Sequence, residues 1–480
     1  MRLELIGKIN GTYVQTLCAM FFHGEKFPKD TLDNTRTLKV VANDTPYGIE
    51  CFCEFNVNGK FAKGTGFCPF GDEPYERTSK TAVGKAVYEA GVTLTGKTIP
   101  WGILTGIRPS KVANELILKH GEEKAYQILV ARYLLSNEKA KLAIQIAKNE
   151  NVILSLGSEN TCSIYISIPF CPSRCTYCSF VSYATPKLYS LIPQYLDKLI
   201  LDLKSTAKAI AKQGLKVISI YIGGGTPTIL NEEQLDLLLS AINSSLDTSH
   251  LLEFTLEGGR PDTITENKLL IAKKYGINRI SVNPQSLNDE VLEAIGRKHT
   301  CADFLDAFSL VKNSGIDHIN TDLIAGLDKD SFESFKNTID KIIELNPDNI
   351  TVHSFCVKKS AQILKNDEGI YEKYDTDAVK SVKYAYEALT KNGYEPYYMY
   401  RQKNTISDLE NVGYAKKNAF GIYNVLMMAD AHTVFGIGAG ATTKIVTCEN
   451  GIIKINRIFS PKYPYEYLQD SKKGSKNEAI

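Results

Sequence analysis

Short apolar segments and longer amphipathic segments alternate through the middle of the chain. The short segments are rich in Ile, Val and other strand-forming residues, and the longer ones repeat apolar residues at helical spacing. The predicted strands are 163–168, 217–222, 252–256, 279–282, 318–324 and 349–355. Helices are predicted between them, for example at 191–212, 232–244, 331–345 and 377–391. This alternation indicates parallel βαβ units, and periodicity alone leaves open whether the sheet closes into a barrel.

The first 150 residues follow a different pattern. Alternating apolar and polar residues indicate half-buried strands at 3–9, 38–41 and 48–57, and helical patterning follows at 85–90, 107–119, 122–135 and 137–149. The stretch 149–160 is polar and loosely patterned. We therefore predict an α/β domain over 1–150, of unknown role, and the βαβ domain over 160–395. A Tyr- and Gly-rich extension packed on the βαβ domain is predicted over 396–470, followed by a disordered tail over 471–480.

Charge and composition exclude several classes of protein. The 480 residues include 56 Lys and Arg against 54 Asp and Glu, a formal net charge of +2. This balance argues against a protein that wraps nucleic acid, and nucleic acid is not expected as a partner. The longest apolar stretch, 421–441, contains Asp430 and His432, and charge at mid-span is costly in lipid. We expect a soluble, cytoplasmic protein that does not contact a membrane.

Three of the eleven cysteines form a compact motif. Cys171, Cys175 and Cys178 have the spacing Cys-x3-Cys-x2-Cys directly after the first strand of the βαβ region. Three thiolates in one loop suit a soft metal site. A structural zinc site needs four protein ligands, and the next position of the pattern is Phe180. The alternatives are a zinc loop with a distant fourth ligand, or a [4Fe–4S] cluster that leaves one iron open.

A glycine-rich segment ends the second predicted strand. The sequence at 221–228 is Tyr-Ile-Gly-Gly-Gly-Thr-Pro-Thr, and consecutive glycines allow a backbone to approach a ligand closely because no Cβ intervenes. A glycine triplet alone is more often a simple turn. This one follows a strand and precedes a helix, so it is expected at the same end of the sheet as the cysteine loop.

Together these motifs resemble the radical S-adenosylmethionine (SAM) superfamily. More narrowly, the sequence resembles the oxygen-independent coproporphyrinogen III oxidase group, which includes haem chaperones, and within it the HemZ-type branch. The resemblance runs from about 163 to 467 and extends to an N-terminal domain with Pro-Trp-Gly at 100–102. It rests on the segments 165–171, 223–227, 256–257, 279–286, 295–297, 322–327, 397–404 and 436–441. The fold it implies is α/β: a partial (β/α)6 radical SAM barrel, a separate N-terminal α/β domain and a short C-terminal extension.

The resemblance also implies roles for individual residues. Cys171, Cys175 and Cys178 would bind three irons of the cluster, and SAM would chelate the fourth. The predicted contacts with SAM, or with a second SAM, are made by Tyr165, Tyr177, Gly224, Gly225, Thr226, Glu257, Gln285, Arg297, Asp322 and the backbone of Cys356. Most of these residues follow successive predicted strands, and the carboxyl ends of barrel strands are where active sites lie.

The implied activity is oxidative decarboxylation of coproporphyrinogen III to protoporphyrinogen IX, with electrons from a reducing partner such as a flavodoxin or ferredoxin. A tetrapyrrole with several propionates requires cationic partners. Candidates for these contacts are Arg260, Lys298, His299 and Arg401, the last among tyrosines. His353 and His432 could ligate haem, although a lone His near a strand end is more often a core residue.

Two departures from the oxidase pattern support an alternative function. Phe180 stands where the oxidases have a fourth cysteine, and Ser167 stands where they have a histidine in the first strand. The chain also leaves little room for their C-terminal cap. The alternatives are therefore a haem chaperone without decarboxylase activity, a radical SAM enzyme acting on another tetrapyrrole, and, more weakly supported, a radical enzyme acting on RNA.

Overall fold

The computed structural model describes residues 1–28, 34–178, 183–356, 375–402, 405, 408–449 and 452–470. The chain forms two compact units. The first contains Met1–Lys148 and Met399–Asp408, and the second contains Asn149–Tyr398 and Leu409–Ile480. Phe180 and the tail 471–480, both singled out in the sequence, lie outside the described residues.

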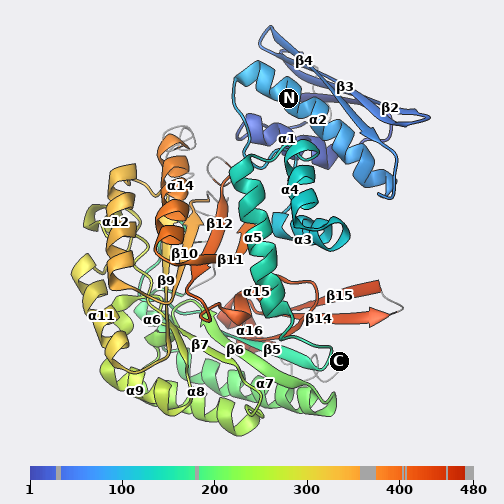
Figure 1. Cartoon of the computed structure of the whole chain (residues 1–480). Coiled ribbons are helices and arrows are strands. Elements are labelled where there is room, and N and C mark those ends of the chain that lie inside the picture. The colour runs from blue at the N-terminus through green and yellow to red at the C-terminus, as the bar shows by residue number, and fades with distance from the viewer. Residues whose placement is uncertain are drawn as a thin grey trace. The chain divides into compact units, whose positions relative to one another are not determined.

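The first unit contains a four-stranded sheet covered by helices (Figure 1). The strand order is β1-β2-β3-β4, with β1 parallel to β2 and the other pairs antiparallel. Small residues let helix α2 approach this sheet, since a Cβ on Gly66 would lie 2.0 Å from the Ala82 carbonyl oxygen. The elements are β1 (Arg2–Ile6), α1 (Gly11–Phe21), β2 (Arg36–Thr45), β3 (Gly48–Val57), β4 (Lys60–Pro69), α2 (Tyr75–Thr95), α3 (Pro109–His120), α4 (Glu122–Ala131) and α5 (Asn137–Leu154).

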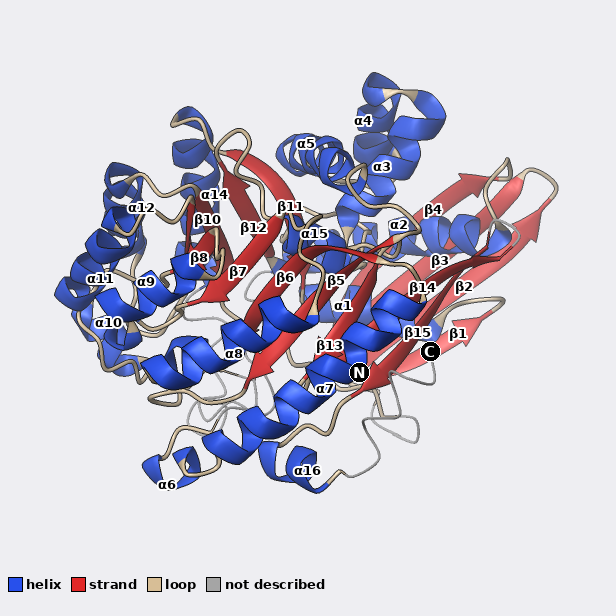
Figure 2. Ribbon diagram, turned by 90° about the horizontal axis from the view of Figure 1, so that it is seen from below, coloured by secondary structure: helices blue, strands red, loops and turns tan. Residues whose placement is uncertain are grey.

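The second unit is built on a mainly parallel sheet in the order β11-β12-β10-β9-β8-β7-β6-β5-β13-β14-β15. The six predicted strands are neighbours in it, all parallel, and they form an open, partial barrel (Figure 2). The predicted partial barrel with a separate N-terminal sheet domain is therefore confirmed. These strands are β5 (Thr161–Ile168), β6 (Lys216–Gly224), β7 (Glu253–Glu257), β8 (Arg279–Ser281), β9 (His318–Ala325) and β10 (Asn349–Ser354).

Strands from the last part of the chain extend this sheet at both edges. On one side β12 pairs antiparallel with β10, and on the other β13 runs parallel to β5. A hairpin of β14 and β15 follows β13. The bounds of these strands are β11 (Glu395–Arg401), β12 (Glu410–Ala415), β13 (Thr433–Ile437), β14 (Thr442–Glu449) and β15 (Ile452–Phe459).

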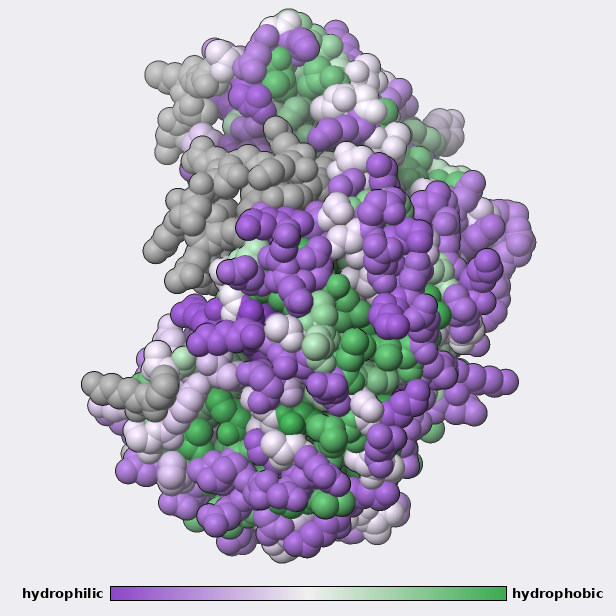
Figure 3. Space-filling model, turned by 90° about the vertical axis from the view of Figure 1, so that its left-hand side faces the viewer, coloured by the Kyte–Doolittle hydropathy of each residue, from purple (hydrophilic) through white to green (hydrophobic). Residues whose placement is uncertain are grey.

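Helices cover the outer face of the parallel strands, and their exposed surface is largely hydrophilic (Figure 3). In the described residues, none of the helices has both the length and the apolar character needed to cross a bilayer. The helices of this unit are α6 (Pro186–Tyr189), α7 (Ile192–Lys212), α8 (Glu232–Ser245), α9 (Glu266–Lys274), α10 (Asp289–Ala294), α11 (Cys301–Asn313), α12 (Phe332–Leu345), α14 (Asp375–Lys391), α15 (Ile422–Met428) and α16 (Pro464–Gln469).

The two faces of the parallel strands differ in polarity because side chains alternate along a strand. Ile164 and Ile166 of β5, like Ile220 and Ile222 of β6, are fully buried and alternate with polar residues. The alternate positions on the other face hold Ser, Tyr, Glu, Arg, Asn, Asp and His. The interior of the partial barrel is therefore polar, and its two ends are organised differently.

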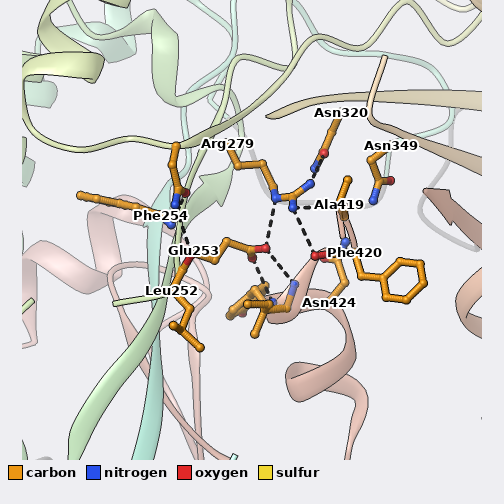
Figure 4. Close-up of polar contacts among 12 residues, drawn as sticks. Leu252, Glu253, Phe254, Arg279, Asn320, Asn349, Ala419, Phe420 and Asn424 are labelled. Carbon is orange, nitrogen blue, oxygen red and sulfur yellow. Dashed lines mark hydrogen bonds and ion pairs between the residues drawn. The ribbon is translucent and has the colours of Figure 1, made fainter. Parts of the chain in front are cut away.

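At the amino-terminal end of the strands, a buried ion pair closes the interior (Figure 4). Arg279 lies 3.1 Å from Glu253, and the side chains of both are 4% exposed. Glu253 also accepts hydrogen bonds from the backbone N–H groups of Ile422 and Tyr423 at the start of α15. The guanidinium of Arg279 donates to the carbonyl oxygens of Ala419 and Phe420. This network anchors the segment that carries α15.

Candidate active site

The cysteine loop follows β5 at the carboxyl end of the sheet. Cys171 and Cys175 are buried, and Cys178 is half-buried. The loop is held from several sides by backbone hydrogen bonds. Cys171 N–H donates to the Tyr183 carbonyl over 3.0 Å, and Thr176 N–H donates to the Ile295 carbonyl over 3.0 Å. The backbone of the loop is therefore held by segments outside it.

The sulfurs of this loop accept hydrogen bonds from Thr226 and Arg260. The Thr226 hydroxyl lies 3.4 Å from Cys171 Sγ, and Arg260 Nη2 lies 3.0 Å from Cys175 Sγ. Within the described part of the chain, no three His, Cys, Asp or Glu side chains surround a single metal-ion position. A cubane cluster does not need three ligands around one position, because each cysteine binds a separate iron atom.

The glycine segment packs tightly under the cysteine loop. Gly225 N–H donates to the Ile168 carbonyl over 2.9 Å, and Thr226 N–H donates to the Phe170 carbonyl over 2.7 Å. A Cβ on Gly225 would lie 2.5 Å from the Phe170 oxygen, a contact that side chains do not tolerate. Gly224 has a φ of +107°, which favours glycine. These glycines therefore bring the ends of β5 and β6 together.

Carboxylates lie at the end of β7 and within β9. Glu257 accepts a short hydrogen bond from the Tyr221 hydroxyl. Burial, followed by the negative charge of Asp322, raises the pKa of Glu257 to about 7, although the Tyr221 hydrogen bond acts in the opposite direction. Asp322 accepts a 3.0 Å hydrogen bond from Asn283, and His353 Nε2 lies 3.8 Å from its carboxylate. The structure thus gathers Glu257, Asp322 and His353, which are distant in sequence.

Gln285 follows β8 in a conformation that is uncommon for a residue with a side chain. Its φ is 68°, in the left-handed region. Its backbone is fixed by hydrogen bonds with Asp322 and Ile324. Among the described residues, its buried Oε1 atom has no hydrogen-bond partner. Buried polar atoms are nearly always paired, so this oxygen is suited to a ligand donor.

Arg297 is buried near the cysteine loop. Its Nη1 donates to the carbonyl oxygens of Asn283, over 2.5 Å, and Gly259, over 3.3 Å. Burial alone lowers the pKa of the Arg297 guanidinium, but the neighbouring Tyr177 and Cys175 raise it above its ordinary value. Burial likewise raises the pKa of the Tyr177 hydroxyl. Tyr177 and Arg297, two predicted cofactor contacts, therefore lie together next to Cys175.

The other predicted SAM contacts lie on the polar face or at its edge. Tyr165 of β5 stacks beside Tyr221, with ring centroids 6.2 Å apart, and beside Tyr423 of α15, with centroids 6.1 Å apart. Cys356 follows β10 at the carboxyl end of the sheet and is half-buried. The assignment of the whole set to SAM binding stays a prediction.

Several substrate candidates have neighbours that the sequence did not suggest. Arg401 belongs to the first unit, where its guanidinium donates to the Leu104 carbonyl and lies over the Trp101 ring. Tyr397 is fully buried, and its hydroxyl accepts a 2.8 Å hydrogen bond from Asn349. His432 Nε2 lies 2.8 Å from the Ser163 hydroxyl, and burial lowers its pKa to about 4. Tyr397 and His432 are therefore packed core residues.

Arg260 and His299, two candidates for contact with propionates, are both buried, and their roles toward a substrate stay predictions. Arg260 is directed at the cysteine loop, with its guanidinium on Ser173 and Cys175. His299 is buried, and burial together with the charges of Arg297 and Arg260 lowers its pKa to about 3. Neither side chain is presented at the surface for a propionate, whereas Lys298 is exposed.

Sequence reasoning missed Tyr221 and Asn283. Tyr221 binds Glu257, and Asn283 connects Asp322 to Arg297 through its side chain and its carbonyl oxygen. Tyr221 lies on the polar face of β6 together with Gly223, and Asn283 follows β8 two residues after Ser281. The alternation along β6 and β8 was the available signal.

Three observations indicate that these residues fit a [4Fe–4S] cluster and SAM. Thiols in one loop with hydrogen-bond donors on two sulfurs suit a cluster. The packing at Gly225 excludes any side chain there. The orphaned Gln285 oxygen and the Glu257 and Asp322 carboxylates supply acceptors for the hydroxyl and amino groups of a ligand.

Comparison with known proteins agrees with this class of site. A sequence model of the radical SAM superfamily matches residues 165–342. The solved coproporphyrinogen III oxidase HemN from Escherichia coli superposes with a TM-score of 0.52 at 21% identity, covering 69% of this chain and 73% of that one. The fold and the cysteine loop therefore define a radical SAM protein, a class that uses a [4Fe–4S] cluster and SAM.

Similarity to curated proteins narrows the assignment. The oxygen-independent coproporphyrinogen-III oxidase-like protein HemZ of Bacillus subtilis is 38% identical over 378 residues, which cover 78% of this chain and 75% of HemZ. The haem chaperone HemW of Lactococcus lactis is 29% identical over 282 residues, which cover 58% and 69% of the two chains. This chain belongs to the coproporphyrinogen III oxidase-like family of radical SAM proteins, in the group that contains HemZ.

The raised pKa of Glu257 predicts a pH-dependent stability. Its pKa rises from 4.5 to about 7 on folding, so the folded protein retains a proton that the unfolded chain releases in this window. Stability is therefore expected to fall as pH rises from about 4.5 to about 7. Glu257→Gln should remove this dependence of stability on pH. The measurement is the melting temperature of the ligand-free protein between pH 5 and pH 8.

Tyr221→Phe supplies a matched test of the same group. The Tyr221 hydrogen bond lowers the pKa of Glu257. Without this hydrogen bond, the fall in stability should extend to higher pH. If the melting temperatures of the wild type and of Glu257→Gln change with pH in the same way, Glu257 does not titrate in this range.

Proposed function

We propose that this protein is a radical SAM enzyme that oxidatively decarboxylates propionate side chains of a tetrapyrrole, converting coproporphyrinogen III into protoporphyrinogen IX. The observation that carries the proposal is the 38% identity with a coproporphyrinogen-III oxidase-like protein over three quarters of each chain. When a [4Fe–4S] cluster and SAM are bound, they supply one-electron cleavage of SAM to a radical that removes a hydrogen atom from the substrate.

The residues at the strand ends would bind and orient SAM. Cys171, Cys175 and Cys178 would hold three irons. Glu257 and Asp322 can accept hydrogen bonds from ribose hydroxyls, and the packed glycines Gly224 and Gly225 allow close approach to the methionine end. The amide of Gln285 offers an acceptor at the same edge of the sheet.

The proposed reaction balances for each propionate. The side chain would lose one hydrogen atom, which SAM, when bound and cleaved, would take up to leave 5′-deoxyadenosine. The carboxylate leaves as CO2, a carbon–carbon double bond forms, and one electron passes to an external one-electron acceptor. Two propionates react in this way to give the two vinyl groups of protoporphyrinogen IX. A flavodoxin or ferredoxin is the proposed reducing partner for SAM cleavage.

The test is an anaerobic assay with reconstituted full-length protein, a reductant, SAM and coproporphyrinogen III. We expect 5′-deoxyadenosine and protoporphyrinogen IX, each absent with Cys175→Ala. SAM cleavage without loss of carboxylate, from protein with a full cluster, would contradict decarboxylation and leave another tetrapyrrole as the substrate to test.

Similarity to HemW supports a second candidate, a haem-binding protein without decarboxylase activity. His353 is the candidate haem ligand, because it is half-buried beside Asp322 at the carboxyl end of the sheet. A spectroscopic titration with haem separates the two functions. Stoichiometric binding that is lost in His353→Ala, with no decarboxylation by the wild type, would favour the chaperone.

A further inference from the structure

Three arginines of the second unit are buried among the described residues, and they differ in how their charge is balanced. Arg279 pairs with Glu253. Arg260 and Arg297 are 4% and 8% exposed, and no carboxylate in the described part of the chain lies within ion-pair distance of either. An isolated buried charge is costly, so these two guanidiniums require a negative charge from another source.

The neighbours of Arg260 identify that source. Its Nη2 donates to the Ser173 carbonyl over 2.9 Å and to Cys175 Sγ over 3.0 Å. Ser173 and Cys175 belong to the cysteine loop, and the Ser173 hydroxyl donates to the Gly296 carbonyl on its other side. Arg297 directly follows Gly296. The neighbouring Cys175 is one of the groups that raise the pKa of the Arg297 guanidinium. The sulfur of Cys175 is therefore the group that both arginines face, and a cluster bound there would supply the negative charge.

Arg260 also has a defined place in the fold. It follows Glu257 by three residues, after β7, and leads into the turn 261–263. The peptide around it is fixed by the Thr263 N–H, which donates to the Arg260 carbonyl over 3.1 Å. The guanidinium therefore approaches the cysteine loop from the neighbouring strands of the barrel, on a backbone that local hydrogen bonds hold in place.

We propose that Arg260 is a positioning residue for the iron–sulfur cluster, which holds the cysteine loop through Ser173 and Cys175 and stabilises the added negative charge of the reduced cluster. Hydrogen bonds from charged donors are the stronger ones, and hydrogen bonds to cysteine sulfurs together with net charge set cluster potentials. The inference rests on cluster binding and is independent of which tetrapyrrole is bound.

The sign of the effect follows from the charge. Reduction adds one electron, and a cation at Cys175 stabilises the reduced form more than the oxidised form. Arg260→Gln should therefore make the cluster harder to reduce. We expect the equilibrium constant for reduction to fall about tenfold, which is about 59 mV for a one-electron couple. Arg260→Lys keeps the positive charge but loses the planar guanidinium group. A smaller shift of the cluster's midpoint potential is therefore expected.

The experiment uses the anaerobically reconstituted full-length protein without any tetrapyrrole. Iron and sulfide content, far-UV circular dichroism and an EPR-monitored redox titration with dithionite are measured for the wild type, Arg260→Gln and Arg260→Lys. Arg174→Gln is the matched control, because Arg174 is exposed in the same loop. Its midpoint potential should equal that of the wild type.

Each outcome bears on the proposal. A lower midpoint in Arg260→Gln, or a folded Gln variant that cannot retain the cluster, supports it. A full cluster with the wild-type midpoint in Arg260→Gln would overturn it, as would loss of the fold in both Arg260 variants, which would make Arg260 a general core residue. Because no substrate is present, a failed decarboxylation assay leaves this result unaffected.

Discussion

Cys175→Ala is expected to abolish cluster binding and SAM cleavage. Cys175 lies between the other two cysteines of the loop, and its sulfur receives the Arg260 hydrogen bond. With only two thiolates left, two irons of the cubane, instead of one, would lack a protein ligand. We expect iron content to fall to background after anaerobic reconstitution, and 5′-deoxyadenosine formation to fall at least a hundredfold, about 2.7 kcal/mol in the free energy of activation.

Cys448→Ala is the matched control for this substitution. Cys448 is an exposed cysteine on β14, so its removal changes the thiol count without touching the loop. Its iron content and absorbance spectrum should match those of the wild type. A full cluster in Cys175→Ala would show that a different set of cysteines binds the irons.

The largest effect on stability is expected at the amino-terminal end of the barrel. Glu253→Gln should lower the free energy of unfolding by about 3–5 kcal/mol, because removing one partner of a buried pair leaves the charge of Arg279 uncompensated. The amide also presents donors where Glu253 accepts from Ile422 N–H and Tyr423 N–H. Urea unfolding followed by circular dichroism measures the loss.

An exposed ion pair gives the comparison for this prediction. Lys341 and Glu344 on α12 lie 2.9 Å apart with both side chains largely in solvent, and such pairs contribute less than about 1 kcal/mol. Glu344→Gln should therefore be nearly neutral. A double-mutant cycle of Glu253→Gln with Arg279→Met should reveal strong coupling. Additive losses, or a Glu253→Gln effect as small as that of Glu344→Gln, would contradict the assigned role of the pair.

The ion pair also explains how the interior of a polar barrel is kept ordered. Arg279 engages Asn320, over 2.8 Å, as well as Glu253 and the carbonyl oxygens of Ala419 and Phe420. Lys444 Nζ donates to three carbonyl oxygens around the end of α15, those of Leu426, Met427 and Ala429. These hydrogen bonds hold α15 against the sheet.

The sequence by itself determined the repeating unit and the cysteine motif that is predicted to bind the cluster. Alternating strands and helices are a local property of residue spacing, and the six predicted strands all appear as neighbours in the sheet. The cysteine spacing and the glycine triplet are likewise local, since each motif occupies one loop after one strand. Family resemblance then identified the cofactors, because the motifs occur in the expected order along the chain.

Tertiary structure alone decided which side chains meet around these motifs. Arg260 was an ordinary cation in the sequence, and only the arrangement of β7 beside the cysteine loop places it 3.0 Å from Cys175. In the same way, Asn283 links Asp322 to Arg297 across neighbouring strands. The parallel pairing of β13 with β5 joins residues more than two hundred and fifty positions apart. Such contacts depend on the whole sheet being assembled, so no local pattern of spacing encodes them.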